Sequence, residues 1–271
     1  MTDQHGEEIY EMKKCAHIIA SLICESCGNI NEKKDRENWS AFEEALGCLE
    51  YTSIEVEIMD QYDKEGDINP FHTGANYEDA YTDLMNVILK LPKLFSEWIS
   101  EISPPTSNFS VFDLDIYYSF RQLIEDDDIF LTFNYTETLE ELYEVDNITH
   151  IHGNRNCPIV GHNNILLTEE KSYFQGVYID KMKNALKKPT EKIINDNEMF
   201  FENLDHDIES IYSYGFSFGE IDLEYIQEMF RYIETRKVTW YLHSHDKCNH
   251  EAFKEKINKC GFCGSFSEFD E

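Results

Sequence analysis

The chain of 271 residues has 54 acidic and 23 basic side chains, a formal net charge of −31 at pH 7, which repels the phosphates that a general DNA or RNA binder must hold. No apolar stretch approaches the roughly 20 residues of a membrane helix, and residues 1–8 lack the basic and apolar regions of a signal peptide, so we expect a cytoplasmic protein that binds no membrane. Solubility is the simplest explanation of the charge, and attraction to a basic protein partner is the alternative.

Residues 7–125 are predicted to be mainly helical. Apolar residues recur at helical spacing in three stretches, 9–23, 39–49 and 81–99. No apolar strand followed by a glycine-rich turn precedes residue 7, although such a turn usually opens a nucleotide-binding α/β domain. We therefore expect a sheet with an incomplete edge, at which the phosphate-binding strand is missing.

From residue 128 onward, apolar runs alternate with amphipathic stretches. The predicted strands lie near 129–133, 148–152, 158–161, 208–215 and 237–243. The predicted helices lie near 136–144, 170–187, 190–204, 221–234 and 248–259. Such alternation is typical of an α/β fold in which one mostly parallel sheet is covered by helices on both faces. We divide the chain into a mainly helical region, 1–125, packed on an α/β core, 126–271.

Two neighbouring strands of the predicted core end in polar side chains. The apolar run 129–133 is followed by Asn134, and the next strand ends at His152 and Gly153. In open parallel sheets the ligand binds beyond the carboxyl ends of the strands, so Thr132, Asn134 and His152 should face one crevice. The alternative is structural: Asn134 caps the turn, and His152 closes its strand beside Gly153.

An ordered series of motifs resembles the AbiH family of bacterial phage abortive-infection proteins, which is itself similar to the sirtuin-like NAD-binding fold. The motifs are Asn38-Trp-Ser-Ala-Phe-Glu-Glu-Ala-Leu46, Thr132-Phe-Asn-Tyr-Thr-Glu-Thr-Leu-Glu140, His150-Ile-His-Gly153, Gly161-His162, Lys188-Pro-Thr-Glu-Lys-Ile-Ile194 and Gly215-Phe-Ser-Phe-Gly-Glu-Ile-Asp222. Several ordered motifs are more specific than any one of them. Two features depart from the family: its opening Gly-Asn-Gly-Phe-Asp turn is absent, and Phe216 stands where a His is common.

The resemblance implies a site for NAD as a substrate. Cleavage of the nicotinamide–ribose bond builds an oxocarbenium-like centre, at which His152 would act as the base and Asn134 would orient the attacking water. The residues that the resemblance places beside the dinucleotide are Thr132, Thr136, Gly153, Gly215, Ser217 and Asp222. Thr136 stands where many sirtuin-like hydrolases carry Asp. For Asp222 the alternative is a helix cap, since Asp is favoured at helix starts.

The eight cysteines, in a chain without a secretion signal, are expected to be free thiols. Two pairs, Cys24 with Cys27 and Cys260 with Cys263, have the CxxC spacing of zinc ligands. A local set of possible ligands precedes the second pair and consists of His243, His245, Cys248 and His250. The resemblance implies no metal, and buried cysteines that act as small apolar residues are the simpler expectation.

Three classes of function follow. The first is an NAD-cleaving effector of phage defence. The second is a non-catalytic sensor or regulator, or an inactive truncated homologue, of such a system. The third is a metal-dependent nuclease or nucleotide hydrolase, which would need carboxylates close enough together to bridge a metal. The expected partners are a second copy of the chain or another protein of the defence system.

Overall fold

The computed structural model describes residues 13–21, 23, 43, 46–47, 49, 62–102, 118–162, 173–204 and 207–270. The chain divides into two compact units. Unit 1 consists of Met1–Ile99 and Cys157–Lys188, and unit 2 consists of Ser100–Asn156 and Pro189–Glu271. Each unit is therefore assembled from two separate segments. The predicted division into 1–125 and 126–271 concerns regions of different secondary structure, and it stays a prediction.

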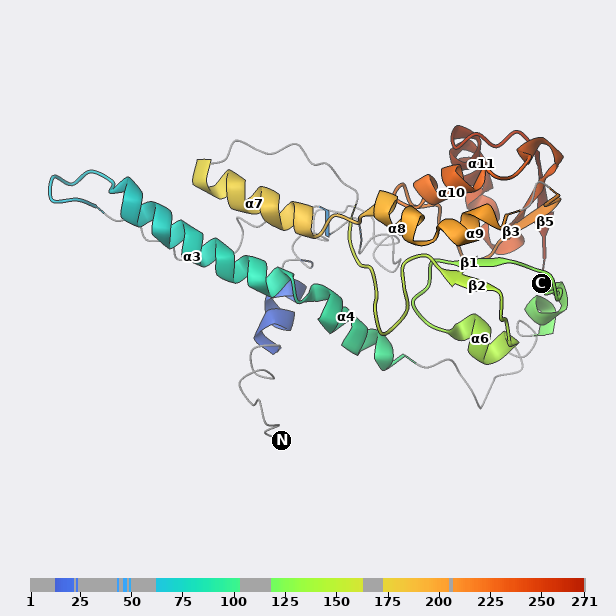
Figure 1. Ribbon diagram of the computed structural model, residues 1–271, viewed down its shortest axis with the longest axis horizontal. Helices are drawn as coiled ribbons and strands as arrows, with labels where there is room; N and C mark the ends of the chain where they lie inside the picture. Colours follow the sequence, from blue (N-terminus) through green and yellow to red (C-terminus); the bar gives the residue numbers. More distant parts are fainter. Residues whose placement is uncertain are drawn as a thin grey trace. The chain divides into compact units, whose positions relative to one another are not determined.

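Unit 1 is built mainly from helices. Its long helices are α3 (Pro70–Ile88), α4 (Leu91–Ser100) and α7 (Tyr173–Ala185). Helices α3 and α7 lie side by side (Figure 1). The side-chain oxygen of Asn69 caps α3 by accepting hydrogen bonds from the backbone N–H groups of Phe71 and His72, and Pro70 takes the first helical position. These capping groups fix where α3 begins.

The predicted helices 9–23 and 39–49 are confirmed at their described residues except Leu49, which lies outside a helix. Residues 13–21 are helical, as are residues 43, 46 and 47. The predicted helix 81–99 is in fact two helices, because α3 ends at Ile88 and α4 begins at Leu91. The rest of 1–30, apart from residue 23, lies outside the described residues, so the missing phosphate-binding strand stays a prediction.

A buried ion pair lies in the core of unit 1. The ammonium of Lys188, whose side chain is fully buried, contacts the carboxylate of Glu43, which is 7% exposed. The backbone around Lys188 is also fixed, because its N–H donates to the carbonyl of His162 at 2.8 Å and His162 N–H donates to Leu186 at 2.9 Å. The pair therefore joins parts of the chain that are 145 positions apart.

Unit 2 contains the alternating strands and helices. Its strands are β1 (Phe130–Thr132), β2 (Ile148–His150), β3 (Ser210–Ser213), β4 (Thr239–His243) and β5 (Ser265–Phe269). Its α-helices include α6 (Thr138–Tyr143), α8 (Thr190–Asp196), α9 (Glu198–Glu202), α10 (Leu223–Met229) and α11 (His250–Lys259), with short 3-10 helices η2 (Thr235–Lys237) and η3 (Ser244–Asn249). Residues 118–123 are also helical. The α/β class is confirmed.

The expectation of one sheet is wrong. Among the described residues, the strand pairs are parallel, but β1 and β2 form a two-stranded sheet, whereas β3, β4 and β5 form a separate three-stranded sheet. Side chains rather than backbone hydrogen bonds link the two: the ring of Phe133, just after β1, stacks on Phe216, just after β3, at 4.3 Å. The apolar runs located the strands, but lateral pairing depends on long-range contacts that the runs do not encode.

Three further elements differ from the prediction. The predicted strand 158–161 is absent from the structure, where only an isolated bridge joins His162 to Lys187. The predicted helix 190–204 is broken at Asn197 into α8 and α9. Strand β5 was not predicted, because Phe266 and Phe269 stand three positions apart and do not alternate as strand residues usually do.

The core of unit 2 lies on one face of the three-stranded sheet. Trp240 and Leu242 of β4 are each 1% exposed. The indole of Trp240 meets the rings of Phe218, Phe230 and Phe262 at centroid distances of 5.7 to 6.0 Å. Within the described ranges, no helix has the length and apolar character needed to cross a bilayer.

Candidate functional site at the strand ends of unit 2

Three connections leave the carboxyl ends of β1, β2 and β3 and carry most of the predicted site residues. The first, 133–137, contains Asn134 and Thr136, the second contains His152 and Gly153, and the third, 214–222, contains Gly215, Ser217 and Asp222. Thr132 is the last residue of β1 and is 7% exposed. The carboxyl ends of parallel strands are the usual place for a ligand.

The connection after β1 is fixed by hydrogen bonds and leaves the Asn134 side chain exposed. The Thr132 hydroxyl accepts from the N–H of Asn134 at 3.2 Å. The Nδ1 atom of His150 lies 3.0 Å from the carbonyl of Asn134, and its Nε2 lies 2.7 Å from the carboxylate of Glu140 on α6. His150 therefore clamps this connection between β2 and α6. His150 lies within one of the sequence motifs, but the motif alone does not predict this role.

A second set of charges holds the same region. The guanidinium of Arg155 contacts the carboxylate of Glu137, and its Nη2 atom donates to Glu141 at 3.1 Å. Thr136 shares a hydrogen bond with the hydroxyl of Thr138 at 2.9 Å, at the start of α6. Thr136 thus stabilises the local turn, and its hydroxyl is engaged there.

His152 lies in a different environment, because it is only 2% exposed. Its ring packs edge-on against Phe133 at 5.5 Å and against Tyr225 at 5.4 Å. Its Nε2 atom lies 3.4 Å from Oδ1 of Asp222, which is 8% exposed. A buried histidine and a buried carboxylate therefore meet between the ends of β2 and β3.

Asp222 does not cap helix α10. It occupies the N-cap position, but its side chain makes no capping hydrogen bond to the helix. The capping alternative is wrong because the carboxylate turns toward His152 instead, with its Oδ2 close to Gly219. The sequence predicts both as site residues but not as a pair, since they follow different strands of different sheets.

Two of the predicted glycines have a backbone reason to be glycine. Gly153 has φ 73° and Gly215 has φ 59°, in the left-handed region that side chains rarely adopt. Ser217 is exposed. Phe218 also has a positive φ, 53°, although it is a fully buried aromatic residue. Because strain of this kind persists only where packing enforces it, the connection after β3 is held by its aromatic contacts.

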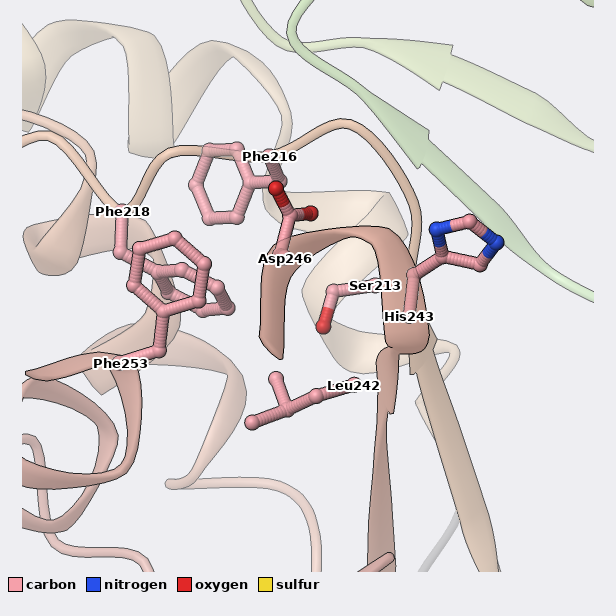
Figure 2. A pocket seen from close by; sticks show the side chains of 7 residues that line it. All are labelled: Ser213, Phe216, Phe218, Leu242, His243, Asp246 and Phe253. Atoms are coloured by element: carbon pink, nitrogen blue, oxygen red, sulfur yellow. The ribbon is translucent and has the colours of Figure 1, made fainter. Parts of the chain in front are cut away.

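A small hollow lies at the carboxyl ends of β3 and β4, as Figure 2 shows, but its enclosed volume is about 0 Å³, so it has no room even for a water molecule. Its lining residues are Ser213, Phe216, Phe218, Leu242, His243, Asp246 and Phe253. The imidazole of His243 points away from the phenyl rings. Ligand pockets usually measure about 300 to 1,000 Å³, so this hollow is too small for a dinucleotide as it stands. Neither Asn134 nor His152 lines it, and their convergence on one cavity stays a prediction.

Comparison with known protein families identifies the chain. The sequence profile of a family described as "Bacteriophage abortive infection AbiH" matches residues 5–244, which is most of the chain. The chain belongs to the AbiH family. This membership assigns the protein to phage abortive infection. No curated protein and no solved structure matches the chain.

The cysteines of this AbiH protein do not form a recognisable metal site where they can be described. Cys24 and Cys27 lie outside the described residues, so a joint zinc site stays untested. Cys260 is buried, its Sγ lies 3.7 Å from the carbonyl of Leu223, and burial, then Glu220, raises its pKa. Cys263 is exposed.

The local histidine and cysteine cluster also fails as a metal site. In the part of the chain that the structure describes, no three His, Cys, Asp or Glu side chains gather as metal ligands would. His250 instead places its Nε2 atom 2.9 Å from the carbonyl of His243, while the rings of His243 and His245 lie 6.3 Å apart. Cys248 is exposed. These side chains are used for local packing and hydrogen bonding.

Proposed function

We propose that this AbiH protein acts in abortive infection by cleaving NAD, with His152 as the base. The contact between His152 and Asp222 carries the proposal, because it pairs an imidazole with a carboxylate at the strand ends where α/β proteins bind ligands. A carboxylate beside one ring nitrogen fixes the tautomer and orientation of an imidazole and stabilises the imidazolium that forms. Asp222 faces Nε2, which leaves Nδ1 to accept a proton.

The reaction is hydrolysis of the bond between ribose and nicotinamide. A water molecule forms a new bond to the anomeric carbon while the glycosidic bond breaks, and the electron pair of that bond neutralises the nicotinamide ring nitrogen. His152 accepts the proton from the water and later releases it to solvent, so the products are nicotinamide, ADP-ribose and a proton. His150 holds the backbone carbonyl of Asn134, and the exposed side-chain amide of Asn134 orients the water.

A closed site fits a protein that must stay silent in uninfected cells. His152 is enclosed by Phe133 and Tyr225, and Phe133 stacks on Phe216. Substrate reaches the imidazole only when the pair formed by Phe133 and Phe216 separates. The proposal therefore assigns this arrangement to the resting state, which infection converts to an open one.

The second candidate is a non-catalytic sensor or regulator. The burial of His152 favours it, since an imidazole packed among aromatic rings that stay closed has a structural role in the core. A metal-dependent nuclease is not favoured, because the described residues bring together no metal-binding carboxylates. The two surviving candidates differ in whether NAD is consumed.

The test is the nucleotide pool of cells that express the intact protein, measured by mass spectrometry with and without phage infection. The proposal expects NAD to fall and ADP-ribose and nicotinamide to rise on infection. His152→Ala should reduce this loss by about 10² to 10⁴ in rate, the usual cost of removing a general base. His245→Ala is the matched control, because His245 is 86% exposed and outside the site. A constant NAD pool in cells that the protein still protects would establish the second candidate.

A further inference from the structure

The sheet of β3, β4 and β5 has two unlike faces. Trp240 and Leu242 lie on the face that packs against the aromatic core. Because side chains alternate along a strand, the strand register places a second set on the opposite face. Two members of this set at the carboxyl ends of the strands, His243 and Phe269, are each only 9% exposed. We call the remaining members the open face: Ser210, Tyr212, Thr239, Tyr241, Ser265 and Ser267.

The open face is accessible to solvent. Ser210, Tyr212, Ser265 and Ser267 are all exposed, and Tyr212 has 51% of its surface accessible. Parallel sheets are normally covered on both faces, and the sequence analysis expected helices on both. A parallel sheet with one face exposed therefore points to a surface that another molecule covers.

Two aromatic rings, stacked against each other, form a rigid platform on this face. The rings of Tyr212 and Tyr241 are stacked, with centroids 4.4 Å apart and an interplanar angle of 8°. The ring of Phe269 meets Tyr212 edge-on at 5.3 Å and supports it. The hydroxyls of Thr239 and Ser265 are hydrogen-bonded to each other at 2.9 Å in the adjacent row. The platform is thus fixed in place before any partner arrives.

The open face carries no charge, but an acidic turn lies beside it. The six residues are Ser, Thr and Tyr, with no acidic or basic side chain among them, in a chain with a net charge of −31. Burial, then the neighbouring Tyr241 and the carboxylates of Asp128 and Glu125, raise the pKa of Tyr212, which places these acids within its electrostatic reach. The turn 125–128 is held by a hydrogen bond from the N–H of Glu125 to the Asp128 carboxylate at 2.9 Å, and it also exposes Asp126 and Asp127.

We propose that the open face binds a protein partner through arginine or lysine side chains. A cation over the face of a tyrosine ring is attracted by the ring, and the carboxylates of the turn 125–128 add charge complementarity. Tyrosine at the centre with charge at the rim is the usual composition of a protein interface. Phosphate-bearing partners are repelled by the turn, and a second copy would bring an equal acidic turn to the contact. This inference does not depend on NAD cleavage.

The test uses a hexa-arginine peptide as the probe, titrated calorimetrically into the intact protein at 0.15 M salt. Tyr212→Ser should weaken binding at least about threefold, the size of one exposed cation–π contact. Tyr62→Ser is the matched control, because Tyr62 is 63% exposed but belongs to unit 1. Asp127→Asn should also weaken binding, whereas Glu65→Gln, which removes the same formal charge from an exposed turn of unit 1, should weaken it less.

Two outcomes would overturn the proposal. The first is equal weakening by Tyr212→Ser and Tyr62→Ser, or none by either, which would mean that the peptide is attracted only by the overall charge. The second is a concentration-dependent dimer in sedimentation that Tyr212→Ser abolishes, which would make a second copy the occupant. The thermal midpoint of each variant should match that of the parent chain, so that a change in binding reports the surface and not the fold.

Discussion

Two buried acid–base pairs, one in each unit, differ in how firmly they are held. In unit 1, Lys188 contacts Glu43 directly, and backbone hydrogen bonds to His162 fix the lysine. In unit 2, His152 and Asp222 stand 3.4 Å apart among aromatic rings, beside a connection with a strained backbone at Phe218. Both pairs are buried, so burial alone does not show whether an acid–base pair is structural or functional. The closely held pair joins distant segments, while the looser pair lies where strands end and ligands bind.

The largest stability effect should come from the pair in unit 1. Lys188→Met leaves the Glu43 carboxylate buried without the ammonium, and it should lower the free energy of unfolding by about 3 to 5 kcal/mol. Urea unfolding measures this change. Lys254→Met is the matched control, since its partner Glu251 is 91% exposed, and it should change little. Equal losses in the two variants would show that the buried pair is not a structural link.

A substitution in the pair of unit 2 should lower activity more than stability. Asp222→Asn keeps the shape of the side chain but removes the charge that, in the proposed mechanism, orients His152 as the base, and a misplaced base costs about 10²-fold in rate. The rate of nicotinamide release from NAD measures it, together with the pH profile of that rate. If the rate falls only in proportion to the folded fraction, Asp222 is structural and the contrast between the two pairs disappears.

A smaller loss is expected at the neighbouring histidine. His150→Gln disrupts the hydrogen bonds to Glu140 and to the carbonyl of Asn134, and it should destabilise the protein by about 1 to 3 kcal/mol. Urea unfolding again provides the measurement, with the 86% exposed His245→Gln as control. A larger effect of His150→Gln than of Lys188→Met on stability would reverse the order predicted here.

The smallest expected effect is on the reactivity of the Cys260 thiol. Cys260 is buried, and its neighbour is a carbonyl rather than an opposite charge. Burial raises the pKa of its thiol, so less thiolate is present at pH 8 than for an exposed cysteine. Iodoacetamide should therefore label the exposed Cys263 before Cys260. The raised pKa contributes stability that is present below the unfolded pKa of about 8.5 and is lost as the pH rises through the folded pKa. Peptide mass spectrometry follows the labelling of each cysteine. Equal labelling rates at Cys260 and Cys263 would contradict the predicted order.

Local sequence patterns predicted the elements of unit 2 better than their arrangement. The apolar run before Asn134 located β1, and the polar residues after it were correctly assigned to a connection. The contact between His152 and Asp222 could not be predicted, because it joins the ends of strands in two separate sheets. Strand β5 was missed because its phenylalanines do not alternate. The role of His150 depends on a partner from α6, which periodicity does not reveal.

Nicotinamide release by the purified intact protein tests most directly whether this protein cleaves NAD. NAD is added together with extract from phage-infected or uninfected cells, and nicotinamide and ADP-ribose are counted by mass spectrometry. If the protein cleaves NAD, infected extract should give equal amounts of both products, and uninfected extract should give little of either. His152→Ala should lower the rate of nicotinamide release by about 10² to 10⁴. NAD that stays intact with infected extract, from a protein that protects cells against the same phage, would contradict NAD cleavage.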